Sequence, residues 1–306
     1  MTPNKKASVV EKLLGLTLVA FLCIPSISGA SAGGSDTAFS ARALQMIKAK
    51  GADKVDLIVT YRNAASAADE DAVRGQGANL RRALPLINGH AISVPAQAAQ
   101  KLVEKTPNID HVSVDESLEA AYYTVGSPSV GSSHSSVPTA VMRAYPGLST
   151  LAYTGSDIRV AVIDTGMRSH PDGKPVAKAS FVAGEKEDDN HGHGNHVAGT
   201  IAGSGSHSEG PYRGIAPDAE IVVARALDEY GVGQASDVIA ALEWVVKSKD
   251  EFNIRVVNLS LGHPVYESVE TDPLVQAVEA LVRVIEEDGE MLFPDRFIVQ
   301  AEESGM

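Results

Sequence analysis

The run IRVAVID at residues 158–164 restricts the possible folds more than any other stretch of the chain. It is apolar at nearly every position, without the alternation of a strand that has one solvated face, so it predicts a strand buried in a parallel sheet. Asp164 ends the run, at the edge where open α/β sheets place their active residues. The stretches 214–225 and 256–259 predict further strands with helical patterns between them. We therefore expect an α/β domain with a parallel sheet and helices on both faces.

Two of these helical patterns begin at recognisable capping residues. Ser236 is expected to cap a helix whose apolar residues recur at helical spacing, and Trp244, the only tryptophan, is expected to pack within it. Asp272 and Pro273 are expected to start another helix, with apolar positions that continue to Ile285.

The stretch from Asp188 to Gly203, DDNHGHGNHVAGTIAG, places three histidines where a loop enters a predicted helix. Three interpretations are open for His191, His193 and His196. They can lie in a solvated loop, or they can bind zinc at the HxHxxH spacing of some zinc hydrolases. The third interpretation is that one of them is a general base. The rest of the chain has to decide between these interpretations.

Length and charge set broad limits. The chain has 306 residues, enough for about two domains, and 44% hydrophobic with 21% charged residues is ordinary for a globular protein. The net charge of −13 argues against nucleic acid or an anionic membrane as a partner, because both favour a basic face.

The N-terminus reads as an export signal. Lysines precede an apolar run at 13–24, and small residues lead up to a predicted cleavage site near Ala32, so residues 1–32 are expected to be a signal peptide. An uncleaved anchor is the alternative. The product is expected to be secreted, extracellular or periplasmic. The single cysteine, Cys23, lies within this run, so the mature chain would contain no disulfide and no cysteine nucleophile.

Residues 33–121 predict a small α/β module without clustered catalytic side chains. Its strands and helices follow the order βαββαβ, which is typical of a ferredoxin-like sandwich. Residues 122–138 are rich in Gly, Ser and Pro and predict a linker. The second domain is expected to occupy residues 139–306.

Four motifs of the second domain occur together in a recognisable order: VAVIDTG at 160–166, HGNHVAGT at 193–200, GIAPDA at 214–219 and VVNLSLG at 256–262. They resemble the successive signatures of the subtilisin-like serine proteases, or subtilases. The βαββαβ module resembles the inhibitory propeptide of that family. The resemblance covers most of the chain from about Val55 to Arg283, and it implies a partial subtilisin-like sheet preceded by an inhibitor I9-like propeptide.

The resemblance also implies roles for individual residues. Asp164 would be the triad aspartate and His193 the general base, which takes a proton from a serine hydroxyl while the carboxylate fixes its tautomer. The extended edges that hold a peptide substrate as an added strand would be formed by Gly231, Gly233, Ser260, Leu261 and Gly262. The family gives His191 no role, and His196 is expected to support the loop or to pack.

The chain departs from the family after this point. The Ala-Gly-Asn turn that supplies the oxyanion asparagine and the Gly-Thr-Ser-Met-Ala motif that supplies the nucleophile do not occur in it, and the only serines after Asn258 are Ser260, Ser268 and Ser304. The tail from about residue 284 also stops resembling the family. We expect an incomplete catalytic domain that is inactive alone, either because the chain is cut or shifted in frame or because the gene has decayed.

Cofactors and partners complete the expectations. No cofactor or metal is assigned: calcium is common in the family, but the loop 203–210 lacks a run of side-chain oxygen ligands. The expected partners are a polypeptide substrate and the chain's own propeptide, with no membrane after signal cleavage, and the protein is expected to be a monomer. Two alternative functions are a propeptide-type peptidase inhibitor or chaperone, and a zinc hydrolase that uses the three clustered histidines.

Overall fold

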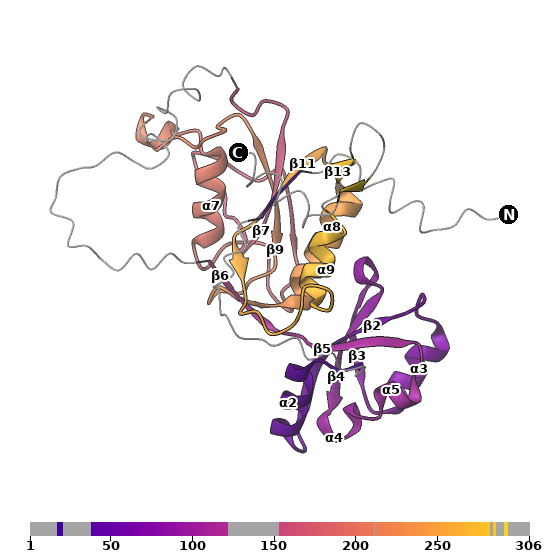
Figure 1. Cartoon of the computed structure of the whole chain (residues 1–306). Coiled ribbons are helices and arrows are strands. Elements are labelled where there is room, and N and C mark those ends of the chain that lie inside the picture. The colour runs from indigo at the N-terminus through magenta and orange to yellow at the C-terminus, as the bar shows by residue number, and fades with distance from the viewer. Residues whose placement is uncertain are drawn as a thin grey trace. The chain divides into compact units, whose positions relative to one another are not determined.

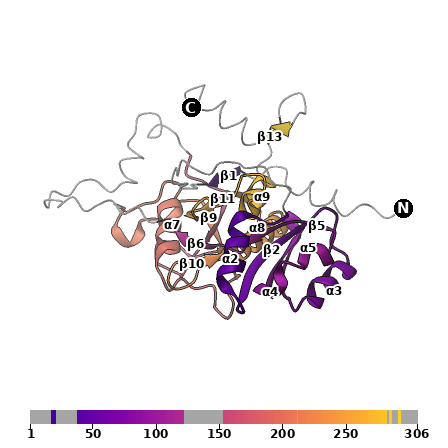
Figure 2. The same ribbon diagram turned by 60° about the horizontal axis from the view of Figure 1, so that its bottom comes forward.

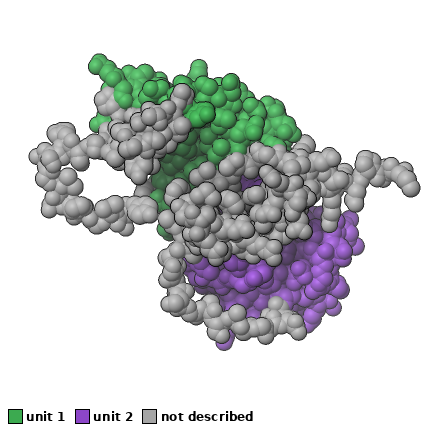
Figure 3. All heavy atoms as spheres, turned by 45° about the horizontal axis from the view of Figure 1, so that its top comes forward, with its two compact units in different colours: residues 1–23, 118–233, 244–262 green, residues 24–117, 234–243, 263–306 purple. Residues whose placement is uncertain are grey.

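The computed structural model describes residues 17–20, 38–121, 153–210, 212–281, 284–285 and 291–292. These fall into two compact units that interleave along the chain (Figure 3). Unit 1 comprises residues 1–23, 118–233 and 244–262, and unit 2 comprises residues 24–117, 234–243 and 263–306. The predicted cleavage site, the linker 122–138 and the segment 293–306 lie outside the described residues.

Unit 1 is built on a five-stranded parallel sheet with the strand order β1-β11-β7-β9-β8 (Figure 1). The predicted run at 158–164 forms the central strand β7, and Asp164 at its end pairs with Arg225 of β9. The chain is thus α/β with a parallel sheet, as the sequence predicts. The strands are β1 (Thr17–Ala20), β7 (Arg159–Asp164), β8 (Ala177–Ser180), β9 (Glu220–Arg225) and β11 (Ile254–Leu259).

Helix α7 (His193–Ala202) packs along one face of this sheet through small side chains. Ala198 and Ala202 meet Val160, Val162 and Ile221 in a buried apolar cluster. Small residues bring the helix axis close to the sheet, so the first residue of α7 comes near the end of β7.

A short three-stranded sheet with the order β10-β6-β12 also occurs in the structure. Its strands are β10 (Val232–Gln234), β6 (Ser117–Ala120) and β12 (Leu261–Gly262). Trp244, in helix α8 (Ala235–Ser248), lies in unit 1 with its ring 6.2 Å from Phe181 and 5.9 Å from Phe252, centroid to centroid. A short 3₁₀ turn, η2 (Ser206–Ser208), follows α7.

Unit 2 contains an antiparallel four-stranded sheet with the order β3-β4-β2-β5, which shields a separate apolar core. Its elements follow the βαββαβ order expected from the sequence, preceded by helix α2, which was not predicted and is capped by the Ser40 hydroxyl. They are α2 (Ala41–Lys50), β2 (Lys54–Tyr61), α3 (Ala67–Gly75), β3 (Asn79–Leu84), η1 (Pro85–Ile87), β4 (Gly89–Pro95), α4 (Ala96–Ala99), α5 (Leu102–Lys105) and β5 (Ile109–Val114).

Two predicted helix boundaries are wrong. Ser236 does not cap α8; the helix begins one residue earlier, and Ser236 donates its amide and hydroxyl to the carboxylate of Asp115. Asp272 caps α9 as predicted, but α9 (Pro273–Glu279) is shorter than its apolar pattern. Ile285 belongs instead to strand β13 (Val284–Ile285), which pairs with β14 (Met291–Leu292). The acidic residues that follow Ile285 in the sequence would oppose the dipole of a longer helix.

Among the described residues, no helix combines the length and the apolar character that crossing a bilayer requires.

Candidate active site

Asp164 and His193 come together where strand β7 ends and helix α7 begins. Nδ1 of the His193 imidazole lies 2.8 Å from Oδ1 and 2.9 Å from Oδ2 of the Asp164 carboxylate. The carboxylate is fully buried, and the imidazole side chain is 10% exposed. Because Nδ1 is bonded to the carboxylate, a proton on Nδ1 leaves Nε2 as the nitrogen that can accept one.

The carboxylate also changes the proton affinity of the ring. The hydrogen bond to Asp164 raises the pKa of His193 above its usual 6.5, and this effect outweighs the opposing effect of burial. The Ala121 backbone, which also hydrogen-bonds to the ring, raises this pKa further. The pair therefore forms a base whose protonated state is stabilised by a fixed negative charge.

Asp189 fixes the entrance of α7, and sequence reasoning gave it no role. Its side chain, in a residue only 4% exposed, accepts hydrogen bonds from the Thr165 hydroxyl and from the amides of His191, Gly192 and Asn195, at 2.7 to 3.0 Å. The amides at a helix start have no partner within the helix. Asp189 and the Thr165 hydroxyl, which accepts the Gly194 amide, thus cap α7 although the residue before it is glycine.

Two glycines allow the strand end and the helix start to meet. A Cβ on Gly194 would lie 2.1 Å from the carbonyl oxygen of Gly166, and Gly166 itself has φ +106°. Any side chain at Gly194 would push α7 away from β7, and His193 with it. The close contact explains why glycine occurs two residues after Asp164 and directly after His193.

Buried Arg225 holds the loop that leads to Asp189. It lies at the end of β9 and is fully buried. Its guanidinium donates to the carbonyls of Lys186 and Asp188 at 2.8 and 2.6 Å and pairs with the Glu185 carboxylate. Five donors in a rigid fork suit such a position, because several carbonyls can be satisfied at once.

The residues predicted to hold a peptide lie on both sides of strand β6. The Ala120 amide donates to the Gly231 carbonyl and the Ala121 amide donates to the Ser260 carbonyl, both at 2.9 Å. Leu261 pairs antiparallel with Ala120 and Gly262 with Glu119, and Gly233 lies in β10 on the other side. Residues 118–121 thus form an added strand whose end reaches the His193 ring. Strand β6 lies beside helix α7 in Figure 2.

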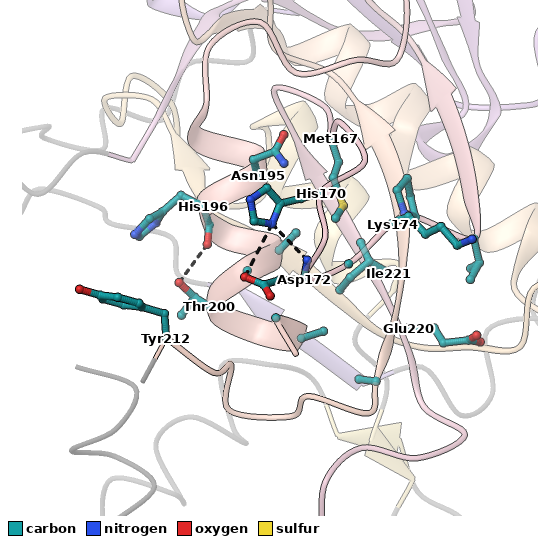
Figure 4. A pocket seen from close by; sticks show the side chains of 18 residues that line it. Met167, His170, Asp172, Lys174, Asn195, His196, Thr200, Tyr212, Glu220 and Ile221 are labelled. Atoms are coloured by element: carbon teal, nitrogen blue, oxygen red, sulfur yellow. Dashed lines mark hydrogen bonds and ion pairs between the residues drawn. The ribbon is translucent and has the colours of Figure 1, made fainter. Parts of the chain in front are cut away.

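The other two histidines of the motif do not form a zinc site with His193. His191 lies with its ring centroid 6.4 Å from that of His193, while His196 lines a hollow beside α7 that includes neither Asp164 nor His193 (Figure 4). No group of three His, Cys, Asp or Glu side chains within the described ranges could hold a metal ion. The geometry therefore does not support the zinc hydrolase.

The loop after α7 bonds to the carboxylate of Asp172. The carboxylate of Asp172, in the hollow of about 1030 Å³ shown in Figure 4, accepts from the His207 amide at 2.7 Å and from the hydroxyls of Ser206 and Ser204 at 3.0 and 3.4 Å. All three donors bond to the same oxygen, Oδ1 of Asp172.

Comparison with known proteins gives one family. Residues 155–301 match the family model Peptidase_S8, described as the subtilase family. This match continues past Arg283, where the motif resemblance ended, and reaches residue 301.

Two relatives and one solved structure extend the comparison. Subtilisin E of Bacillus subtilis (strain 168) is 31% identical over 263 residues, which cover 83% of this chain and 60% of subtilisin E. Serine protease AprX of the same strain is 39% identical over 134 residues, covering 41% of this chain and 30% of AprX. Fervidolysin from Fervidobacterium pennivorans, described as a keratinolytic enzyme related to subtilisin, has a similar fold at 20% identity, with a TM-score of 0.56 over 85% of this chain and 41% of that one. The chain spans 60% or less of each of these proteins.

Proposed function

Because this chain belongs to the subtilase family, we propose that it carries the Asp and His members of the triad of a secreted serine-type endopeptidase, preceded by its propeptide. One observation supports this proposal above the others. A buried carboxylate holds His193, and the ring meets the backbone of Ala121 at the end of a strand that is bonded along both edges.

The chemistry is peptide-bond hydrolysis. His193 Nε2 takes the proton of a serine hydroxyl as its oxygen attacks the carbonyl carbon, and then gives that proton to the leaving amine. Water then cleaves the acyl-enzyme. His193 takes a proton from the attacking water and gives one to the serine oxygen as its bond to the acyl group breaks. Asp164 remains ionised and holds the imidazole in the tautomer that can accept at Nε2.

We assign Ala121 as the last residue of the propeptide, so that Tyr122 begins the mature chain. The support is the register of the added strand: Ala121 donates to Ser260 and lies against His193, where the carbonyl of a cleaved bond has to be. The subtilisin E alignment covers 83% of this chain, more than residues 122–306 can supply, so it also includes part of the 38–121 region.

The 306 residues are proposed to be inactive alone, because they contain neither the family's serine motif nor its oxyanion asparagine. In subtilisin, loss of the nucleophile lowers kcat about 10⁶-fold, and loss of one oxyanion donor lowers it about 10²- to 10³-fold. We expect the purified chain to show no peptidase turnover. Turnover abolished by a serine-directed inhibitor would overturn this part of the proposal.

The general-base assignment needs a chain that contains the nucleophile. The test therefore uses a longer product that carries a Gly-Thr-Ser-Met-Ala motif after these residues, and we expect that product to hydrolyse peptides. His193→Ala should abolish that activity, whereas His196→Ala, in the hollow beside α7, should leave it nearly unchanged. Full activity in the His193 variant would refute the assignment.

A second candidate function is peptidase inhibition by the propeptide-like segment. The observation that favours it is the separate apolar core of the four-stranded sheet, which includes Leu57, Ile92 and Ile109. Titration of residues 38–121 against subtilisin E should lower its peptidase activity. An unchanged rate at saturating fragment would count against this function.

A further inference from the structure

The four-stranded sheet of unit 2 is buried on both faces. We refer to this sheet and its helices, residues 38–117, as the module. On one face, Leu57 and Ile92 belong to the apolar core shared with helices α2 to α5. Side chains of a strand alternate between its two faces, so the neighbouring Ile58 and Ala91 lie on the other face. They are 1% and 0% exposed, so this second face is covered as well.

A row of paired residues crosses the second face. Ile58 of β2 pairs with Ser113 of β5 on one side and with Ala91 of β4 on the other. Ala91 in turn pairs with Arg82 of β3. The Arg82 guanidinium lies 3.0 Å from the carboxylate of Asp237, in the first turn of α8. Helix α8 therefore holds one end of the row.

The opposite end of the row meets the loop between β12 and α9, residues 263–272. The Ser113 hydroxyl donates to Oε2 of Glu267 at 2.8 Å. The His111 imidazole, two residues earlier on the same strand, lies 3.3 Å from the same oxygen. The Glu267 side chain is only 6% exposed. A carboxylate so far removed from water depends on the donors that the protein supplies.

The 263–272 loop also contacts the first helix of the module. The Arg42 guanidinium of α2 lies 4.4 Å from the centroid of the Tyr266 ring, and its Nε donates to Glu116 at 3.1 Å. Cation–π contacts of this kind are attractive. The space left between the loop and Val114 is a cavity of about 10 Å³, enough for one water molecule at most. The loop thus fits closely against the module.

We propose that the 263–272 loop is a recognition surface for the module, and that it selects a module whose last strand offers hydrogen-bond donors to Glu267. An apolar residue at the position of Ser113 would leave this buried carboxylate without its hydroxyl donor, so the loop also discriminates against other modules. The inference rests on the proposed function, because it takes residues 38–121 as a propeptide that recognises its own catalytic domain.

Hydrogen exchange at the start of α8, in the full 306-residue chain, reports whether the module is docked. The Ala235 amide donates to the Glu116 carbonyl at 2.8 Å, and the Ser236 amide donates to the Asp115 carboxylate at 2.9 Å. Amides at a helix start have no acceptor within the helix, so the protection of these two depends on the module. Glu267→Ala should speed exchange at both amides about tenfold, because a buried hydroxyl loses its charged acceptor and the module opens more often.

A double-mutant cycle tests whether this effect passes through the contact with the module. Ser113→Ala should speed exchange by a similar factor, and the variant with both changes should exchange little faster than Glu267→Ala. The matched control is Glu270→Ala, which removes an exposed carboxylate of the same loop and should leave both amides protected. Trp244, which lies in unit 1, should keep its fluorescence in all four variants.

The outcomes are distinguishable. Protection that Glu267→Ala does not reduce, or effects of the two substitutions that simply add, would overturn the role of the loop and leave the proposed function standing. Wild-type Ala235 and Ser236 amides without protection would mean that the module is not docked on α8. That result would overturn the propeptide part of the proposed function together with this inference.

Discussion

Each end of helix α7 is organised by one carboxylate, but the two carboxylates differ in burial. At the start of the helix, Asp189 is 4% exposed and accepts four hydrogen bonds from the loop and the helix. Beyond its end, Asp172 has a partly exposed side chain and accepts from the His207 amide and from serine hydroxyls. A buried donor that loses its partner cannot turn to water, whereas a donor at the surface can. A carboxylate should therefore stabilise the start of α7 far more than the segment beyond its end.

The largest expected effect follows removal of the buried carboxylate. Asp189→Ala should lower the free energy of unfolding of unit 1 by about 3 kcal/mol, because it leaves several buried amides and the Thr165 hydroxyl without an acceptor. Denaturant titration followed by Trp244 fluorescence measures this, since Trp244 is the only tryptophan. The control is Asp188→Ala, whose carboxylate is half exposed and pairs with Lys178. Equal losses in the two variants would contradict the comparison.

A smaller effect is expected for the hydroxyl that joins strand and helix. Thr165→Val should cost about 1.5 kcal/mol, because the Gly194 amide loses its acceptor in a buried site. Thr200→Val, near the other end of α7, should cost less than about 0.5 kcal/mol, because the Thr200 hydroxyl is exposed and only donates to the carbonyl of His196. If the two valine variants unfold at the same denaturant concentration, burial is not what separates the two ends.

The pH dependence of stability should also distinguish the two ends of α7. The raised pKa of His193 means that the folded state binds this proton more tightly than the unfolded state, so its contribution is complete below pH 6.5 and is lost as the pH rises through the folded pKa. Asp164→Asn should reduce the loss of unfolding free energy that occurs as the pH rises. Urea titrations at several pH values between about 6 and 9 measure it, and an identical slope in wild type and variant would show that the pair does not bind the proton as described.

The smallest effect is expected at Asp172. The His207 amide, first among several donors, holds the pKa of this carboxyl below 3.8, so its contribution is present above pH 3.8 and is lost as the pH falls through the folded pKa. Asp172→Asn should remove this contribution at neutral pH, and screening by solvent should keep the loss close to the error of a denaturant titration. A loss comparable to that of Asp189→Ala would remove the distinction between the two ends.

The sequence predicted the parts of this site that depend on local patterns. A continuous β-branched run predicted β7, and a glycine-rich turn before small apolar residues predicted the start of α7. These two elements bring Asp164 and His193 together. The supporting residues could not be found in the same way. Asp189 and Arg225 act through contacts with backbone groups up to 39 residues away in the sequence, which no period or spacing records.

The same limit explains the errors outside the site. Ser236 has the residue type and position of a helix cap, but in the structure its hydroxyl donates to Asp115, 121 residues earlier. The apolar periodicity predicted that the last helix extends to Ile285, whereas α9 ends at Glu279. Local propensity identifies where helices occur, while tertiary partners decide where they end.

We propose that the Asp164 carboxylate raises the pKa of His193 and so makes its imidazole a stronger base. An NMR titration of this imidazole in the full chain tests the proposal most directly. We expect a titration midpoint above 6.5 in the wild type and a lower midpoint in Asp164→Asn, where burial persists without the carboxylate. A wild-type midpoint at or below 6.5 that Asp164→Asn does not change would contradict it.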